Sequence, residues 1–185
     1  IRNKGAMNAI ISSEIFDVEI LKERLSKVPS MDGLELSSKV CTKEPYFVGD
    51  EKAKYKVAVL DLGVKKSILT CLAERGCYIK VFPMEASIEE MIAWRPDGFM
   101  LSNGPGDPSV MTAQIETVGA IANAGLPVFG ICLGHQILAI SQGLSVFFTK
   151  SSTRAYNFAL VSFMFMCFGP VLSAVINGKL ISVCT

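Results

Sequence analysis

Apolar and polar positions follow one another along residues 56–144 in an order that predicts alternating strands and helices. Four short apolar runs are typical of buried parallel strands, and they lie at 57–62, 78–82, 98–101 and 128–131. Four further segments carry apolar residues at helical spacing, at 65–75, 87–94, 112–124 and 133–142. Because parallel strands need crossover connections, this part of the chain is predicted to be α/β, a parallel sheet flanked by helices.

The N-terminal part of the chain has a weaker pattern. Ala9–Ile11 is compatible with a short strand, and Asp17–Val28 has apolar residues on one helical face with Pro29 after its end. Residues 1–41 are too few to form a core alone, so we expect them to be the remnant of an N-terminal domain whose beginning is absent. Residues 42–55 are polar and charged and are predicted to be a linker.

The C-terminal residues 145–185 differ in composition and form an atypical apolar tail. The stretch 158–176 contains no charged residue and is long enough to be a candidate membrane span. Two alternatives are a buried helix pair and an abnormal chain end such as out-of-frame coding. We favour the abnormal end, because the change of character is abrupt, and we do not expect a membrane protein.

Charge and cysteine usage exclude several classes of function. The chain has 18 Lys and Arg against 17 Asp and Glu, a net charge of +1, without the basic stripe of a nucleic-acid-binding protein. Its 6 cysteines form no C-x-x-C pair and it has one histidine, which argues against a metal site and a disulfide framework. With no signal-peptide pattern at the start, we expect a reducing, cytoplasmic setting.

The candidate chemistry lies where the fourth apolar run meets the last helix. Cys132 stands at this corner, and Gly130 and Gly134 give the backbone room for a sharp turn. A thiol at a helix N-terminus is favoured as the reactive thiolate, and the N–H of Leu133 is a natural oxyanion donor. The alternative is that Cys132 is an ordinary buried cysteine at a strand end.

A second turn, Ser102–Pro108, follows the third apolar run. Its prolines and glycines impose an irregular backbone that a ligand can approach closely. Since parallel strands end at one edge of the sheet, it is expected to face Cys132 and offer N–H groups to the same pocket. The alternative is an ordinary tight loop. A dinucleotide site is not expected, because no G-x-G-x-x-G follows a strand.

These turns resemble those of known enzymes. G-I-C-L-G-H-Q at 130–136 resembles the nucleophile turn of class I glutamine amidotransferases. Together with S-N-G-P-G-D-P at 102–108 it is similar to the small subunits of carbamoyl phosphate synthases. Residues 61–69 resemble that family's opening strand and helix, with Ser67 where Asn is usual, and 2–8 resemble the end of its N-terminal domain.

The resemblance covers roughly residues 1–144 and implies a flavodoxin-like amidotransferase domain, partial here, over 56–144. It implies that Cys132 is the nucleophile, forming a thioester with glutamine. It also implies glutamine and oxyanion contacts from Gly104, Gly106, Leu133 and Gln136. Ammonia would pass to a large subunit that uses ATP and bicarbonate to make carbamoyl phosphate for arginine and pyrimidine synthesis. The chain itself would need no cofactor or metal.

The resemblance ends after Leu144. The family's later His-x-Glu pair, which completes its catalytic triad, does not occur in this sequence, and the one histidine is His135. We expect His135 to pack locally rather than act as the base. This polypeptide is therefore expected to have little activity. Two alternatives to an active enzyme stay open: an inactive truncated fragment, and a non-catalytic α/β binding module.

Overall fold

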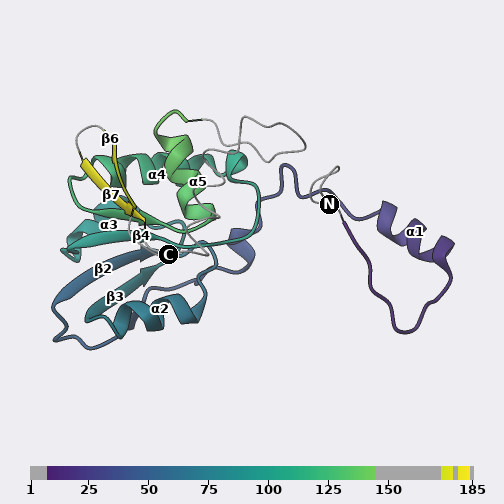
Figure 1. The fold of residues 1–185 in the computed structure, drawn as a ribbon, viewed down its shortest axis with the longest axis horizontal. Coiled ribbons are helices and arrows are strands. Elements are labelled where there is room, and N and C mark those ends of the chain that lie inside the picture. The colour runs from purple at the N-terminus through teal and green to yellow at the C-terminus, as the bar shows by residue number, and fades with distance from the viewer. Residues whose placement is uncertain (1–7, 145–171, 177–178, 184–185) are drawn as a thin grey trace.

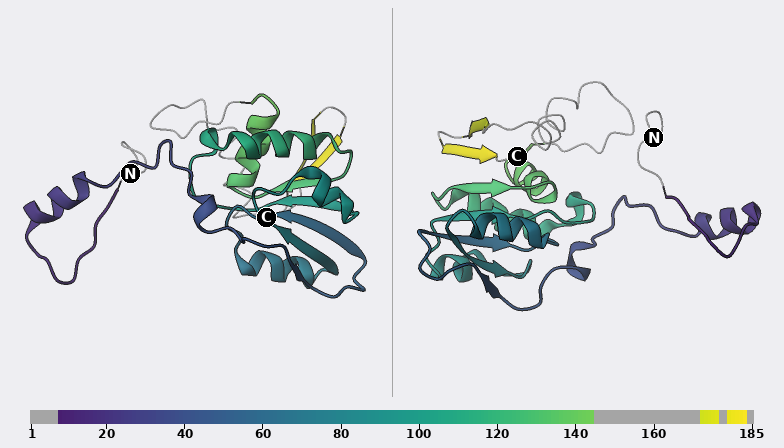
Figure 2. Two further views of the ribbon diagram at one scale, coloured as in Figure 1. Left: turned by 180° about the vertical axis from the view of Figure 1, so that it is seen from behind. Right: turned by 60° about the horizontal axis from the view of Figure 1, so that its bottom comes forward.

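The computed structural model describes residues 8–144, 172–176 and 179–183. An α/β domain occupies most of the described chain, and an extended arm at the N-terminal side carries the first helix away from it (Figures 1 and 2). The main sheet has five strands in the order β1-β3-β2-β4-β5. Their bounds are Tyr46–Val48 (β1), Tyr55–Leu60 (β2), Cys77–Phe82 (β3), Gly98–Leu101 (β4) and Val128–Gly130 (β5).

Strands β2 to β5 are parallel, whereas β1 is antiparallel to β3. Val59 at the centre of the sheet lies in register with Val81 of β3 and Met100 of β4. Because β2, β4 and β5 run in the same direction, the turns that follow them all leave from one edge of the sheet. The predicted α/β fold class is confirmed, with one antiparallel strand added.

Helices cover both faces of the sheet (Figure 1). The helices are Val18–Ser26 (α1), Lys66–Ala73 (α2), Ile88–Ala93 (α3), Thr112–Asn123 (α4) and Leu133–Ser141 (α5), and the 3₁₀ turns are Ser37–Lys39 (η1) and Pro108–Val110 (η2). On one face α3, α4 and α5 pack on Leu60, Phe82 and Phe99. On the other face Leu69 of α2 packs on Val59 and Val81. Burial of these apolar faces is the main stabilising contribution.

The helices and strands predicted for 56–144 are confirmed, with ends shifted by a few residues. The capping box of α3 is also present: the Ser87 side chain accepts from the Glu90 N–H, and the Glu90 carboxylate accepts from the Ser87 N–H. Within residues 42–55, the sequence did not reveal β1. Its three residues lie between Pro45 and Gly49 and are mostly exposed, so no buried apolar run marks it.

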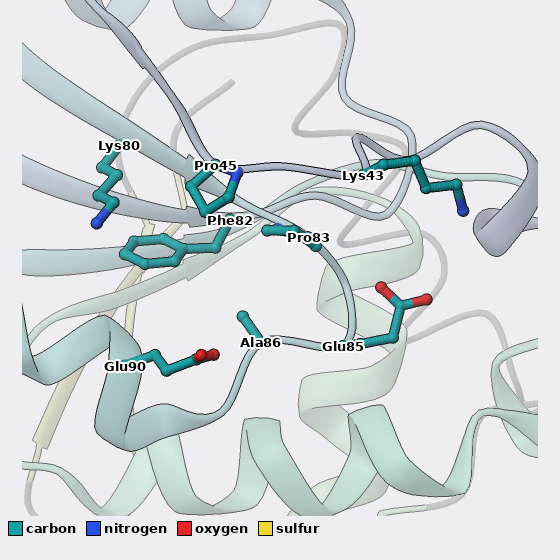
Figure 3. Close-up of a pocket in the computed structure, with 8 residues that line it drawn as sticks. All are labelled: Lys43, Pro45, Lys80, Phe82, Pro83, Glu85, Ala86 and Glu90. Carbon is teal, nitrogen blue, oxygen red and sulfur yellow. The ribbon is translucent and has the colours of Figure 1, made fainter.

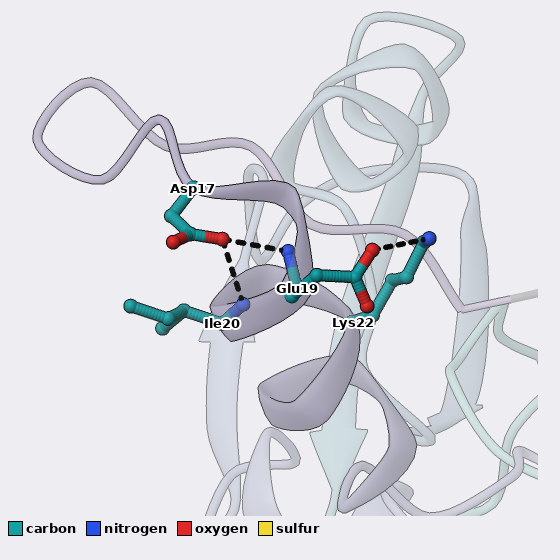
Figure 4. Close-up of polar contacts among 4 residues, drawn as sticks. All are labelled: Asp17, Glu19, Ile20 and Lys22. Atoms are coloured by element: carbon teal, nitrogen blue, oxygen red, sulfur yellow. Dashed lines mark hydrogen bonds and ion pairs between the residues drawn. The ribbon is translucent and has the colours of Figure 1, made fainter.

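The N-terminal arm shows one correct and one wrong prediction. Helix α1 is present, but Ala9–Ile11 forms no strand: Ile11 is 99% exposed, and no strand within the described residues pairs with it. The helix is held by local contacts (Figure 4): Asp17 accepts from the N–H groups of Glu19 and Ile20, and Lys22 pairs with Glu19 at 2.8 Å. No residue of α1 is buried.

Near the C-terminus, Leu172–Ile176 (β6) and Lys179–Val183 (β7) form an antiparallel pair. Most of the candidate membrane span 158–176 lies outside the described residues, and its last five residues are a strand rather than part of a helix. In the part of the chain that the structure describes, no helix has the length and apolar character needed to cross a membrane.

Candidate functional site

Cys132 lies between the end of β5 and the start of α5, as the sequence predicts, and its side chain is exposed. Its backbone has φ 50° and ψ −108°, a left-handed conformation that is unusual for a residue with a side chain. Such strain costs about 1–3 kcal/mol and is concentrated at functional sites. As N-cap of α5, Cys132 makes no side-chain capping hydrogen bond. The thiol is thus presented to solvent beside the first turn of α5.

Two glycines allow the corner to press against its neighbours. A Cβ on Gly130 would lie 2.8 Å from the backbone nitrogen of His135, and a Cβ on Gly134 would collide with the carbonyl oxygen of Leu101. The N–H of Gly134 donates to the carbonyl of Ser102 at 3.1 Å. These contacts hold the start of α5 directly on the end of β4. Any larger side chain at either glycine would force the corner away from the sheet.

The turn after β4 lies at the same edge and is tied to the turn after β2. Ser102 is fully buried; its hydroxyl accepts from the N–H of Leu62 and donates to the carbonyl of Asn103, both at 2.8 Å. The Asn103 side chain donates to the carbonyl of Gly63 at 3.0 Å and accepts from the N–H of Lys65 at 3.2 Å. Side-chain hydrogen bonds from Ser102 and Asn103 therefore hold the turn after β4 against the turn after β2.

At Gly104 the turn after β4 meets residues 130–134, here called the cysteine corner. A Cβ on Gly104 would collide with the Leu62 carbonyl and would lie 2.9 Å from Cδ2 of Leu133. Leu133 itself is fully buried at the first position of α5. Gly104 and Leu133 are therefore neighbours, and the N–H of Leu133 belongs to the first turn of a helix, where amides have no partner within the helix. The structure brings together these two sequence-predicted residues.

Gly106 and Gln136, the other two predicted contact residues, flank this centre. Gly106 has φ +109°, which favours glycine, and forms an antiparallel bridge with Glu35. Gln136 lies on the first turn of α5, is half-buried, and donates its backbone N–H to the Cys132 carbonyl at 3.0 Å. Both residues thus lie on the two segments that meet at the corner. Their contacts with glutamine stay predictions.

His135 is half-buried on α5, and burial lowers the pKa of its imidazole. It is therefore neutral at pH 7. Among the other described thiols, Cys71 is exposed as Cys132 is, whereas Cys41 is buried and Cys77 half-buried. Burial raises the pKa of the Cys41 and Cys77 thiols. Among the described residues, no three His, Cys, Asp or Glu side chains are grouped closely enough to hold a metal ion.

The sequence did not reveal the role of Asp61, which directly follows β2. Its side chain is 3% exposed, and its carboxylate accepts from the N–H groups of Thr42, Gly63 and Val64, each at 2.8 Å. One acidic residue thus fixes the turn after β2 and attaches residue 42 to it. The available signal was a carboxylate immediately after a buried apolar run, where a charge needs backbone partners.

A separate pocket of about 520 Å³ lies at the β3 side of the domain (Figure 3). Two lysines and two glutamates line it together with apolar residues, namely Lys43, Pro45, Lys80, Phe82, Pro83, Glu85, Ala86 and Glu90. The Glu90 carboxylate is engaged in the capping box of α3. None of the cysteine-corner residues lines this pocket, so it is not part of the candidate site.

Comparison with known proteins identifies the family. Residues 58–169 match the protein family described as "Glutamine amidotransferase class-I". Proteins named carbamoyl phosphate synthase small chain are similar to 85% of this chain: that of Chlorobaculum tepidum is 43% identical over 159 residues, that of a Synechococcus strain 42% over 169, and that of Pyropia yezoensis 38% over 173. The chain spans less than half the length of these relatives, 43–45%. The chain belongs to the class I glutamine amidotransferase family.

Proposed function

We propose that this chain carries the glutaminase site of a carbamoyl phosphate synthase small chain, with Cys132 as the nucleophile. The observation that supports this most directly is the conformation of Cys132: an exposed thiol on a strained corner, at the start of a helix, next to a glycine-rich turn. Strain at an exposed nucleophile is a recognised property of such corners. Membership of the class I glutamine amidotransferase family supports the choice of glutamine as substrate, and the similarity to proteins named carbamoyl phosphate synthase small chain supports the choice of enzyme.

The proposed reaction begins when the Cys132 sulfur attacks the carbon of the glutamine side-chain amide. The oxygen of that amide gains negative charge, which N–H groups of Leu133 and of the turn containing Gly104 and Gly106 would stabilise. The amide nitrogen takes up the proton that the Cys132 thiol has given up and leaves as ammonia, and a thioester of glutamate with Cys132 is formed. Water then cleaves the thioester, releasing glutamate and restoring the thiol. Gln136 and the glycine-rich turn would hold the rest of the glutamine.

The product ammonia would pass to a large synthetase subunit. That partner would use ATP and bicarbonate to make carbamoyl phosphate, a precursor for arginine and pyrimidines. No cofactor or metal on this chain takes part in the proposed half-reaction. The partner is proposed from the names of the relatives, since small chains imply a large one.

One observation favours a second candidate function: a chain that forms the glutamine pocket but does not hydrolyse glutamine. Hydrolysis needs a base, and the sequence has one histidine, His135, which packs its backbone against Gly130. A half-buried imidazole on α5 is a poor candidate for the base. We therefore expect this polypeptide alone to release ammonia from glutamine at or near the rate of a Cys132→Ser variant.

The direct test is covalent labelling with a diazo-ketone analogue of glutamine, mapped by mass spectrometry. We expect Cys132 to be labelled first, free glutamine to slow that labelling, and Cys132→Ser to abolish it. The matched control is Cys71→Ser, which removes another exposed thiol and should leave the labelling of Cys132 unchanged. Equal labelling of Cys71 and Cys132, unaffected by glutamine, would show that the corner is not a glutamine site.

A further inference from the structure

A segment far upstream in the sequence lies across the glycine-rich turn. Residues 33–42, here called the strap, contact the turn at three points. The N–H of Asp107 donates to the Leu34 carbonyl at 2.8 Å, and the Asp107 carboxylate accepts from the N–H of Gly33 at 2.8 Å. The Ser37 hydroxyl donates to the Pro105 carbonyl at 2.9 Å. These hydrogen bonds join parts of the chain that are separated by 68 to 74 positions in the sequence.

Gly106 is held through its neighbours rather than through its own peptide groups. It pairs with Glu35 in an antiparallel bridge, and the hydrogen bond of that bridge runs between the flanking residues Asp107 and Leu34. In an antiparallel pair of this type, the N–H and C=O of the two facing residues point away from each other. The strap therefore restrains Gly106 without using its N–H, which points away from the strap.

The approach of the strap is close. A Cβ on Gly106 would lie 2.9 Å from both the Leu34 carbonyl oxygen and the Leu36 nitrogen. Ser37 is fully buried, so its hydroxyl bond to Pro105 is shielded from water. Removing a buried hydroxyl leaves the carbonyl that it served without a partner, which is unfavourable. The Ser37–Pro105 contact is thus a defined point at which the turn can be released.

The far end of the strap is anchored to the same edge of the sheet. The Thr42 N–H donates to Asp61, the residue that also fixes the turn after β2, and Cys41 is buried in the core. Within the strap, the Glu35 carboxylate accepts from the N–H of Ser38. Although burial works to raise the pKa of Glu35, its hydrogen bonds from Ser38 lower that pKa overall, so the carboxylate stays charged at neutral pH.

We infer that the strap is a positioning element of the glutamine pocket, and that Ser37 and Asp107 are the positioning residues through which it fixes the amides of residues 104–106. This inference rests on the proposed function, because the turn is taken to bind glutamine. Ser37 itself touches the turn and not the substrate. Its role is to keep the N–H groups of the turn in one arrangement before glutamine arrives, which lowers the cost of stabilising the oxyanion.

The test compares Ser37→Ala with its neighbour variant Ser38→Ala in the full chain. Ser38 donates its hydroxyl to Glu35 inside the strap and, among the described residues, forms no hydrogen bond with the turn, so it is a matched control. The first readout is amide hydrogen exchange over residues 103–107. We expect exchange to become about tenfold faster in Ser37→Ala, the effect of one lost hydrogen bond, and to stay unchanged in Ser38→Ala.

The second readout is the ratio of two labelling rates at Cys132, that of the diazo-ketone analogue of glutamine to that of iodoacetamide. Iodoacetamide reports the thiol alone, whereas the glutamine analogue also needs the pocket. The ratio should fall about tenfold in Ser37→Ala, as expected for one lost hydrogen bond, with the iodoacetamide rate unchanged. A merely structural role would change both rates together or neither.

The outcomes separate the two proposals. If wild-type Cys132 shows no preference for the glutamine analogue, the proposed function fails, and the pocket role of the strap fails with it. If wild type shows the preference but Ser37→Ala behaves like Ser38→Ala in both readouts, the strap inference alone is overturned. Should Ser37→Ala not fold, Asp107→Ala replaces it with Ser109→Ala as control. Ser109 bonds the other oxygen of Asp107 and leaves the Gly33 contact in place.

Discussion

Helices α1 and α5 have the same length, nine residues each, but are stabilised in opposite ways. Helix α1 has a favourable local start: the Asp17 carboxylate caps its first turn, and two lysine–glutamate pairs lie along its surface. It buries no side chain. Helix α5 starts on the strained Cys132 without a side-chain cap, yet five of its residues are buried.

The difference shows where the stability of each helix comes from. A cap contributes about 0.5–2 kcal/mol and an exposed ion pair about 1 kcal/mol or less, and isolated helices of this length are marginal in water. Helix α5 is instead held by packing and by contacts with β4, which can offset an unfavourable start. This allows Cys132, which makes no side-chain capping hydrogen bond, to occupy the N-cap of α5. A strained residue such as Cys132 is tolerated only where tertiary contacts supply the stability.

The largest expected effect comes from removing the same side chain from each helix. Ile137 of α5 is fully buried in the core, whereas Ile20 of α1 is 44% exposed. Ile137→Ala should lower the free energy of unfolding by about 2–5 kcal/mol, because it leaves a cavity. Ile20→Ala should change it by less than about 0.5 kcal/mol. Urea denaturation followed by tryptophan fluorescence, reporting on Trp94, measures both.

Equal losses for the two variants would contradict this contrast and would mean that α1 has a packing partner. The prediction concerns the cooperative unit that contains the sheet. Trp94 is suited to report on it, because it packs against the core cluster on the α3 side and lies near Phe47 and Tyr78.

The contrast between α1, which is stabilised locally, and α5, which is stabilised by packing, also explains which elements the sequence could predict. The apolar runs and helical spacing of residues 56–144 are sufficient for the elements found there, because burial and periodicity agree in each of them. Helix α1 was equally visible, since its cap and spacing are local. Ala9–Ile11 was predicted wrongly because three apolar residues without a neighbouring strand do not form a sheet.

The candidate site was predictable only in part. The position and exposure of Cys132 follow from a strand, two glycines and a helix in sequence. The contacts that fix the site do not: Ser37 meets Pro105 and Ser102 meets Leu62 across gaps of 68 and 40 residues. Nothing in the local pattern marks either serine as buried. Such contacts depend on the finished fold, which is why the strap was not apparent from the sequence.

A second prediction concerns glycines within helices. Gly134 of α5 faces the backbone of Leu101, while a Cβ on Gly119 of α4 would make only ordinary contact, 3.8 Å from the Ser141 Cβ. Gly134→Ala should therefore destabilise the domain by about 2–3 kcal/mol through overpacking. Gly119→Ala should stabilise it by up to about 1 kcal/mol, because alanine favours helix. The two midpoints of thermal unfolding should move in opposite directions.

If both substitutions stabilise the domain, α5 does not lie on β4 as described. In that case the cysteine corner would lose the contact that justifies its strain. Labelling of Cys132 in Gly134→Ala offers a further check: we expect the glutamine analogue to react more slowly than in Gly119→Ala.

The smallest expected effect is the response of α5 to acid. Burial holds the pKa of His135 below its unfolded value of about 6.5. As the pH falls through 6.5, the unfolded chain binds a proton that the folded chain does not, so the folded state loses stability, by at most about 1.4 kcal/mol per pH unit.

Two carboxylates of the domain titrate below this pH range. The pKa of Asp107 is lowered by its hydrogen bond from Ser109 and then by that from Gly33, and the pKa of Glu35 is lowered as well. Denaturation midpoints measured between pH 7.5 and 5.5 should decline in the wild type and decline less in His135→Gln. An identical slope in both proteins would place the imidazole in water and remove α5 as the acid-sensitive helix.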